Sequence, residues 1–249
     1  MNSVESRLIY CNENFAVVNK LPGEMCSFDE GKADKRFYIP EIFKSVISKR
    51  INKTPECVEC VNRIDRPVSG LVLLAVSEDG ERILKGLFAA KEKVIKKYWA
   101  IVEGIIEQDK TPVVLKDYMY FNPSKQKSYI CVKEHRKSKY AELEYVLKGA
   151  GERYSYLEIQ LKTGRTHQIR AQLAEKNLHI RGDLKYGAKR SDTRPGIRLH
   201  SAYLSFEYPG DKRYVFSAPV NEVDALWNDA LRFLASEDIS SNVTGDKVE

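Results

Sequence analysis

Alternating apolar and polar positions predict most of the strands in this 249-residue chain. The pattern is clearest at Tyr140–Leu147 and Tyr154–Leu161, where every second side chain is apolar, as in a strand with one buried face. The stretch Gly149-Ala150-Gly151 between them predicts a hairpin loop. The continuous apolar run Leu71–Val76 fits a strand buried on both faces. Further strands are expected at Phe15–Lys20, Lys97–Glu103, Leu199–Tyr208 and Arg213–Phe216, the last two joined by a turn at Pro209-Gly210.

Three helices are predicted from apolar stripes at helical spacing. The first has Ser77 as its N-cap and runs to about Lys91, and the second begins after Thr166 and ends at about Lys176. The third is amphipathic and covers residues 223–234.

These elements predict an α+β fold, in which a large, mostly antiparallel mixed sheet is flanked by few helices. Residues 24–56 show no clear period, and we expect them to combine helix and loop. A chain of this length can bury a sizeable core in one domain. Because no repeat, low-complexity block or linker stands out, we expect a single domain over residues 1–236 and a polar, frayed tail over 237–249.

Positive charge is concentrated in the middle and second half of the chain. Lys and Arg total 41 and Asp and Glu total 35, a formal charge of only +6. Residues 161–200, however, carry ten basic and three acidic residues, and residues 121–140 carry six and one. Residues 221–249 are acidic, with seven acidic residues against two basic ones. This distribution suits a polyanionic partner, although charge alone fits a solvated basic face equally well.

The beginning of the chain and its cysteines favour the cytoplasm. Residues 1–14 have no apolar core of a secretory signal, and no apolar stretch approaches the roughly 20 residues of a membrane span. Five cysteines are expected to stay reduced. Cys57 and Cys60 have the spacing of half a zinc or redox site, but no second pair matches them, so we expect no metal.

The densest group of candidate catalytic residues is the stretch Asn62–Gly70. It places Asp65 between two guanidinium groups, those of Arg63 and Arg66, just before the apolar run. The proline after Arg66 disfavours helical geometry there, and Gly70 permits a tight turn. We therefore expect Asp65 on a loop at the start of a buried strand, a place where catalytic groups often lie. A surface turn with a local ion pair is the alternative.

A second candidate is the stretch Leu161–Arg170, where a strand ends, Gly164 turns the chain and a helix begins. Free N–H groups at a helix start, with Arg165 beside them, attract a phosphate or a carboxylate such as Asp65. His167 in this stretch fits either a base or a hydrogen-bonded structural histidine.

A third candidate is Tyr98 in the stretch Lys96–Ala100. A tyrosine in a strand usually packs in the core, but near Asp65 it could stack on an extruded base.

Together these stretches resemble the RluA-type pseudouridine synthases. The resemblance covers about residues 8 to 235 and rests on five stretches in the family's order. They are LIYCNENFAVVNKLPG (8–23), NRIDRPVSGLVLLA (62–75), KKYWAIVEG (96–104), LKTGRTHQIRAQLAEKNLHIRGDLKYGA (161–188) and LHSAYLSFEYP (199–209). The chain departs from the family's signature at three positions, with Asn62 for His, Ile64 for Leu and Val68 where Thr is common. The resemblance is weakest over residues 25–56.

The resemblance implies roles for individual residues. Asp65 matches the catalytic aspartate, and Arg165 matches the arginine paired with it. Tyr98 matches the tyrosine that stacks on the target base and is implicated in proton removal. Arg63 matches the residue that enters the RNA as the target uridine leaves the stack. We expect Arg66, His167 and Arg170 to contact the RNA as well.

The resemblance also implies an activity, the conversion of uridine to pseudouridine in a structured ribosomal or transfer RNA without metal or organic cofactor. The target base must flip out of its stack, at a cost of a few kcal/mol. We expect a cytoplasmic monomer without the N-terminal accessory RNA-binding domain of many relatives, because the first matching segment starts almost at once.

Two other functions fit parts of the sequence. A non-catalytic RNA-binding or ribosome-assembly factor would share the basic stretches. A glycoside hydrolase would use a carboxylate at an anomeric carbon, but it needs a second, paired carboxylate that no motif here supplies.

Overall fold

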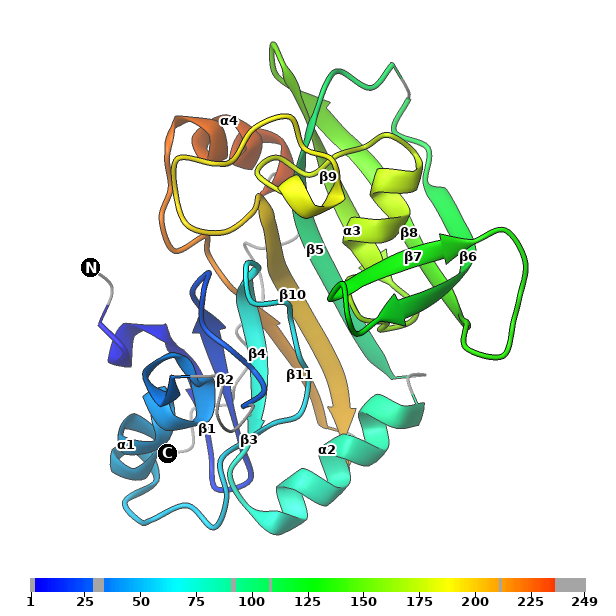
Figure 1. Ribbon diagram of the computed structural model, residues 1–249. Helices are drawn as coiled ribbons and strands as arrows, with labels where there is room; N and C mark the ends of the chain where they lie inside the picture. Colours follow the sequence, from blue (N-terminus) through cyan, green and yellow to red (C-terminus); the bar gives the residue numbers. More distant parts are fainter. Residues whose placement is uncertain (1–2, 29–33, 91–92, 108, 211, 236–249) are drawn as a thin grey trace. The chain divides into compact units, whose positions relative to one another are not determined.

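The computed structural model describes residues 3–28, 34–90, 93–107, 109–210 and 212–235, and these contain eleven strands and four α-helices (Figure 1). The chain divides into two compact units. The described part of unit 1 lies within Met1–Lys96 and Ser201–Glu222, and that of unit 2 within Lys97–His200 and Val223–Asp238. The polar tail expected at 237–249 lies outside the described residues.

Unit 1 is a sheet with two helices. Its strands follow the order β1-β2-β4-β10, with β3 beside β4 and β11 beside β10. The strands are β1 (Leu8–Cys11), β2 (Phe15–Lys20), β3 (Glu59–Cys60), β4 (Ser69–Ala75), most of β10 (Leu199–Tyr208) and β11 (Lys212–Ser217). The helices are α1 (Ile39–Ile51) and α2 (Glu78–Ala90), with short 3-10 turns at Glu5–Arg7 and Lys35–Phe37.

The core of unit 1 explains the apolar run in the sequence. Every residue of β4 is buried, as predicted for residues 71–76. One side of the sheet carries Phe15 together with Leu71, Phe206 and Phe216, and the rings of Phe15 and Phe206 lie 5.5 Å apart. β2 and β4 pair antiparallel, so that Lys20 at the end of β2 lies opposite Gly70 near the start of β4.

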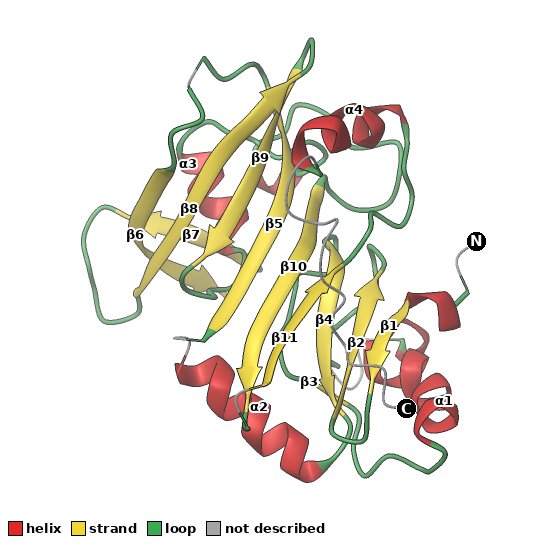
Figure 2. Cartoon of the chain, turned by 180° about the vertical axis from the view of Figure 1, so that it is seen from behind, coloured by secondary structure: helices red, strands yellow, loops and turns green. Residues whose placement is uncertain are grey.

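Unit 2 is an antiparallel sheet in the order β5-β9-β8-β6-β7 (Figure 2). The strands are most of β5 (Val94–Glu103), β6 (Val113–Asn122), β7 (Lys127–Cys131), β8 (Lys139–Ala150) and β9 (Tyr154–Leu161). Helix α3 (Gln168–Glu175) packs through Ala171 on Met119 and Ala141. Helix α4 (Ala225–Leu234) packs its Phe233 ring 5.6 Å from that of Tyr156. A 3-10 turn covers Leu184–Tyr186.

The α+β class and the large, mostly antiparallel sheet are confirmed. Strands β2, β9 and β10 have the bounds expected from the sequence. The N-cap expected at Ser77 is confirmed, since its hydroxyl accepts a hydrogen bond from the Gly80 N–H at 3.1 Å.

Two local predictions were wrong. The N-cap of α3 is His167 rather than Thr166, because the backbone of His167 is left-handed (φ 54°). The expected hairpin loop begins later, because Gly149 and Ala150 belong to β8, which has an irregularity between Leu147 and Gly149. A side chain at Gly149 would collide with the ring of Phe233, so this glycine allows α4 to approach the sheet.

Candidate active site

Asp65 lies in a turn that is fixed at both ends, between β3 and β4 of unit 1. Its backbone carbonyl accepts a hydrogen bond from the Val68 N–H at 2.9 Å. The side-chain oxygen of Asn62 accepts one from the Leu73 N–H at 2.7 Å, which ties the start of the turn to β4. Asp65 is half-buried and Ile64 beside it is buried. Asn62 therefore has a structural use at a position where the family usually has His.

Lys20, the last residue of β2, is hydrogen-bonded to this turn. Its side chain is 0% exposed, and its ammonium group donates hydrogen bonds to the carbonyls of Leu21 at 2.9 Å and Arg66 at 3.1 Å. Burial lowers the pKa of Lys20 to about 8, and the negative charges of Cys26, Glu24 and Asp65 partly offset this effect. Lys20 was not among the candidate residues predicted from the sequence. Its only signal was a lysine at the end of an otherwise apolar strand, directly before Leu-Pro-Gly.

A second segment braces the same turn. Gly23 and Arg66 exchange hydrogen bonds, from the Gly23 N–H to the Arg66 carbonyl at 2.7 Å and from Arg66 Nε to the Gly23 carbonyl at 3.0 Å. Glu24 holds this segment through a buried ion pair with Arg7 at 2.8 Å. The side chains of Arg63 and Arg66 are both exposed and could therefore reach an RNA. That they contact RNA stays a prediction.

Cys60 and the buried Cys26 interact. The interaction with Cys60 lowers the pKa of Cys26 to about 7, against the opposing effect of burial. All five cysteines are free thiols. Among the residues that the structure describes, no group of three or more His, Cys, Asp or Glu side chains is placed to hold a metal ion.

Tyr98 lies on β5 in unit 2, opposite Ile159 of β9. It is 6% exposed, so most of its ring is packed within the protein. Its role as the tyrosine that stacks on a base stays a prediction.

Arg165 lies in the loop between β9 and α3, and this loop is held from two sides. The side-chain oxygen of Gln168 accepts hydrogen bonds from the Arg165 N–H at 2.9 Å and from the Thr163 hydroxyl at 2.8 Å. Nε of Arg165 donates to the backbone carbonyl of Tyr140 on β8 at 2.8 Å. The guanidinium group is therefore oriented by the sheet of its own unit.

His167 and Arg170 converge on Tyr186. Nδ1 of His167 lies 2.9 Å from the Tyr186 hydroxyl. The Arg170 guanidinium stacks 4.8 Å from the centre of the Tyr186 ring and forms an ion pair with Asp183 at 2.7 Å. Arg170 is 4% exposed, so its side chain is held within the protein by Asp183 and Tyr186. The expected contact of Arg170 with RNA stays a prediction that its burial does not favour.

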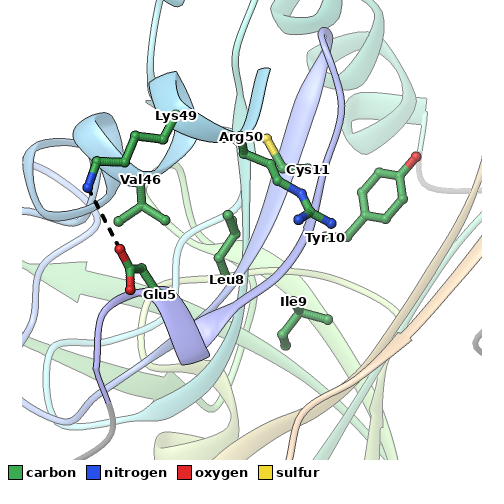
Figure 3. A pocket seen from close by; sticks show the side chains of 8 residues that line it. All are labelled: Glu5, Leu8, Ile9, Tyr10, Cys11, Val46, Lys49 and Arg50. Carbon is green, nitrogen blue, oxygen red and sulfur yellow. Dashed lines mark ion pairs between the residues drawn. The ribbon is translucent and has the colours of Figure 1, made fainter. Parts of the chain in front are cut away.

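The pocket shown in Figure 3 is not part of this group of residues. It has a volume of about 350 Å³ and is lined by residues of β1 and α1 with Glu5, among them Tyr10, Cys11 and Arg50. An ion pair of 3.8 Å joins Glu5 to Lys49 at its edge. None of the candidate site residues lines this pocket. The helices that the structure describes include none long and apolar enough to cross a membrane.

The candidate site residues are thus distributed over the two units. Asp65, Arg63 and Arg66 belong to unit 1, and Tyr98 and Arg165 belong to unit 2. The loops of Asp65 and Arg165 are each fixed by hydrogen bonds within their own unit. That the three proposed catalytic residues act on one uridine stays a prediction.

Comparisons with known proteins agree with the signature around Asp65. The sequence profile of the family described as RNA pseudouridylate synthase matches residues 14–175. The chain is 32% identical over 163 residues to the uncharacterized RNA pseudouridine synthase YlyB of Bacillus subtilis (strain 168), covering 65% of this chain but only 52% of that relative. It is 29% identical over 215 residues to the dual-specificity RNA pseudouridine synthase RluA of Pasteurella multocida, covering 85% of this chain and 92% of that relative.

A solved structure supports the fold. Human RNA pseudouridylate synthase domain containing 4 superposes with a TM-score of 0.70 and covers 93% of this chain and 94% of its own, at 18% sequence identity. At that identity the likeness concerns the fold alone. The family profile, by contrast, covers more than half of the chain and includes the Asp65 turn, Tyr98 and the Arg165 loop. The chain therefore belongs to the RNA pseudouridylate synthase family, which confirms the RluA-type resemblance and the enzyme class expected from its sequence.

Proposed function

We propose that this chain isomerises specific uridines to pseudouridine within a structured ribosomal or transfer RNA, with Asp65 as the catalytic carboxylate. The observation that carries the proposal is the Asp65 turn. It has the family's signature, it is half-buried, and hydrogen bonds fix both of its ends.

The reaction breaks the bond between ribose and a uracil nitrogen, rotates the base and rejoins it through carbon. It needs a carboxylate held close to sugar and base, and orientation of this kind contributes much of the rate in such reactions. The turn supplies the orientation, and the buried ammonium of Lys20 attracts the carboxylate electrostatically.

The remaining roles follow the family resemblance. Tyr98 holds the face of the uracil and takes part in proton removal, and Arg165 is the cation paired with Asp65. Arg63 fills the space left by the flipped uridine and so offsets part of the cost of a few kcal/mol for extrusion. Residues 1–236 act as one catalytic domain, and the protein acts as a cytoplasmic monomer. Light scattering of the purified protein tests the last point.

The decisive experiment compares Asp65→Asn with wild type on total RNA from cells that lack the gene. We expect wild type to restore pseudouridine at defined positions and Asp65→Asn to lose at least about a thousandfold in rate. RNA affinity should change by less than about twofold, since only one carboxylate oxygen is replaced. Asp109→Asn, at an exposed loop position, is the matched control and should be fully active.

Retained activity in Asp65→Asn would refute the assignment of this residue. A wild-type protein that binds RNA but forms no pseudouridine in any RNA would instead favour the alternative of a non-catalytic RNA-binding or ribosome-assembly factor.

A further inference from the structure

Four tyrosines form a continuous row on one face of β6, β7 and β8 in unit 2. We call Tyr118, Tyr120, Tyr129 and Tyr140 the tyrosine face. Tyr120 lies opposite Tyr129, and Tyr118 lies opposite Tyr140. Directly opposed residues of antiparallel strands point to the same side of the sheet. The rings of the first pair stack at 5.6 Å, and those of the second meet edge-on at 5.9 Å.

The tyrosine face is the solvent side of these strands. On the other side, Met119 and Ala141 are buried against Ala171 of α3, and Ile130 packs beside them. Tyr140 is 38% exposed and the other three tyrosines are half-buried. Large aromatic rings in a row facing solvent are more typical of a binding surface than of a core.

Positive charge surrounds the tyrosine face. The ammonium groups of Lys125 and Lys127 lie 6.0 and 5.6 Å from the centre of the Tyr129 ring. The loop that follows β7 adds three further basic residues, Lys133, Arg136 and Lys137, all of them exposed. Two glutamates are also present. Glu142 accepts a hydrogen bond from the Tyr140 hydroxyl, and Glu134 interacts with Tyr118. The surroundings are basic overall, with six basic residues and two acidic residues over 121–142.

The tyrosine face is rigidly connected to the loop of Arg165. The Ser128 N–H on β7 donates to the Tyr186 hydroxyl at 2.8 Å, and its side chain donates to the Thr166 carbonyl at 2.6 Å. Tyr140 itself provides the backbone carbonyl that orients Arg165. Hydrogen bonds therefore join β7 and β8, which carry the tyrosine face, to the loop of Arg165.

We propose that the tyrosine face binds an unpaired stretch of the RNA substrate, with bases stacked on the tyrosine rings and phosphates held by the adjacent lysines and arginines. The inference rests on the proposed function, which makes RNA the substrate. Stacking on aromatic side chains recognises unpaired bases and tolerates any sequence, whereas bases inside a duplex have no free face to offer. The basic rim matches the phosphate backbone. An aliphatic protein surface would gain little from this combination of charge and flat rings.

Binding of a 12-nucleotide oligoadenylate, followed by fluorescence anisotropy, tests the proposal. This probe contains no uridine, so its binding is independent of turnover. The double variant Tyr120→Ala/Tyr129→Ala should bind at least about tenfold more weakly, as expected for the loss of one or more stacked bases. Tyr120→Phe/Tyr129→Phe keeps the rings and should bind within about twofold of wild type. Val114→Ala is the matched control, because Val114 is 47% exposed on the same face of β6 but has no ring.

The proposal is overturned if the double alanine variant binds like wild type, or if wild type does not bind the probe at all, which would point to a protein partner instead. Should the alanine variant fold poorly, photo-crosslinking of an 8-azidoadenosine oligonucleotide to wild type decides. Crosslinks within residues 116–140 support the proposal, and crosslinks only elsewhere contradict it. Asp65→Asn should bind the probe normally. If the wild-type protein had no isomerase activity, the proposed function would be wrong, but the effect of the tyrosine variants on oligoadenylate binding would still test the tyrosine face.

Discussion

Lys20 is a buried cation that is hydrogen-bonded to the Asp65 turn. It is the one buried lysine among the described residues, and it donates hydrogen bonds to the backbone carbonyls of Leu21 and, within the turn, of Arg66. Burial of an ammonium group is costly unless its donors are satisfied and negative charge lies nearby. Here Glu24 and Asp65 supply part of that charge. Lys20 therefore links the stability of unit 1 to the group that we propose for catalysis.

This burial predicts an unusual dependence of stability on pH. In the unfolded chain Lys20 holds its proton up to its ordinary pKa of 10.5, but in the folded protein only up to about 8. Between these values the unfolded chain binds more protons, so the contribution of Lys20 to the free energy of unfolding rises with pH. We expect wild type to gain up to roughly 3 kcal/mol relative to Lys20→Met between pH 7.5 and 10.5.

Urea unfolding of both proteins at several pH values measures this difference, and titrating groups that do not interact with Lys20 cancel in it. Lys44→Met, at an exposed position of α1, is the control and should differ from wild type by a constant amount. A difference between wild type and Lys20→Met that is flat from pH 7.5 to 10.5 would contradict the burial of this ammonium group.

Among the elements, β4 and β10 are neighbouring strands that meet at a glycine of β4. Gly70, the second residue of β4, has φ 110°, a conformation that side chains disfavour. A Cβ atom at this position would lie 2.2 Å from the backbone oxygen of Ser201 on β10. Gly70 is also the register partner of Lys20 on β2. The close packing of three strands at this point therefore requires glycine.

We predict that Gly70→Ala destabilises the protein by about 3 kcal/mol or more, because strain at positive φ adds to a collision with backbone that cannot rotate away. Gly86→Ala is the matched control. Gly86 lies in α2 with no atom within 4 Å of its added Cβ, so alanine there should stabilise by up to about 1 kcal/mol. Thermal and urea unfolding measure both. A neutral Gly70→Ala would show that β4 and β10 can separate without cost.

The elements that the sequence predicted are those with one apolar and one polar face. β2, β9 and β10 have this pattern or an unbroken apolar run, and their bounds agreed with the structure. β6 and β7 were missed because their solvent side carries tyrosines, which removes the alternation that marks a half-buried strand. α1 lies within residues 24–56, where helix and loop were expected, but its bounds could not be predicted because these residues show no helical stripe.

The candidate site could be predicted only in part for a related reason. Asp65 and Arg165 lie in short motifs with turn residues, and local sequence predicts such loops. Lys20, Asn62 and Gln168 act through contacts with backbone groups 3 to 46 residues away, and nothing in the local pattern shows such partners. The N-cap of α3 failed likewise, because His167, with its left-handed backbone, takes the N-cap position and no side chain caps this helix.

At the scale of the whole molecule, the basic residues are unevenly distributed between the two units. The stretches 121–140 and 161–200 both belong to unit 2, which also contains Tyr98 and Arg165. Unit 1 contributes Asp65 and the exposed Arg63 and Arg66. In the proposed function, unit 2 therefore supplies most of the electrostatic affinity for RNA, and unit 1 supplies the carboxylate.

This division predicts how RNA affinity responds to salt. A protein that contacts about six phosphates loses about a thousandfold in affinity between 50 and 200 mM salt, because bound counterions are released from the RNA. We expect the logarithmic salt slope of wild type to be of this order, and Arg136→Gln/Lys137→Gln in unit 2 to reduce it by about 0.7 to 0.9 for each lost phosphate contact. Lys44→Gln/Lys49→Gln, at exposed positions of α1 in unit 1, is the control, because it removes the same two positive charges as Arg136→Gln/Lys137→Gln. Filter binding to transfer RNA at five salt concentrations measures all three slopes. Equal flattening by both double variants would show that net charge, rather than its position in unit 2, determines RNA affinity.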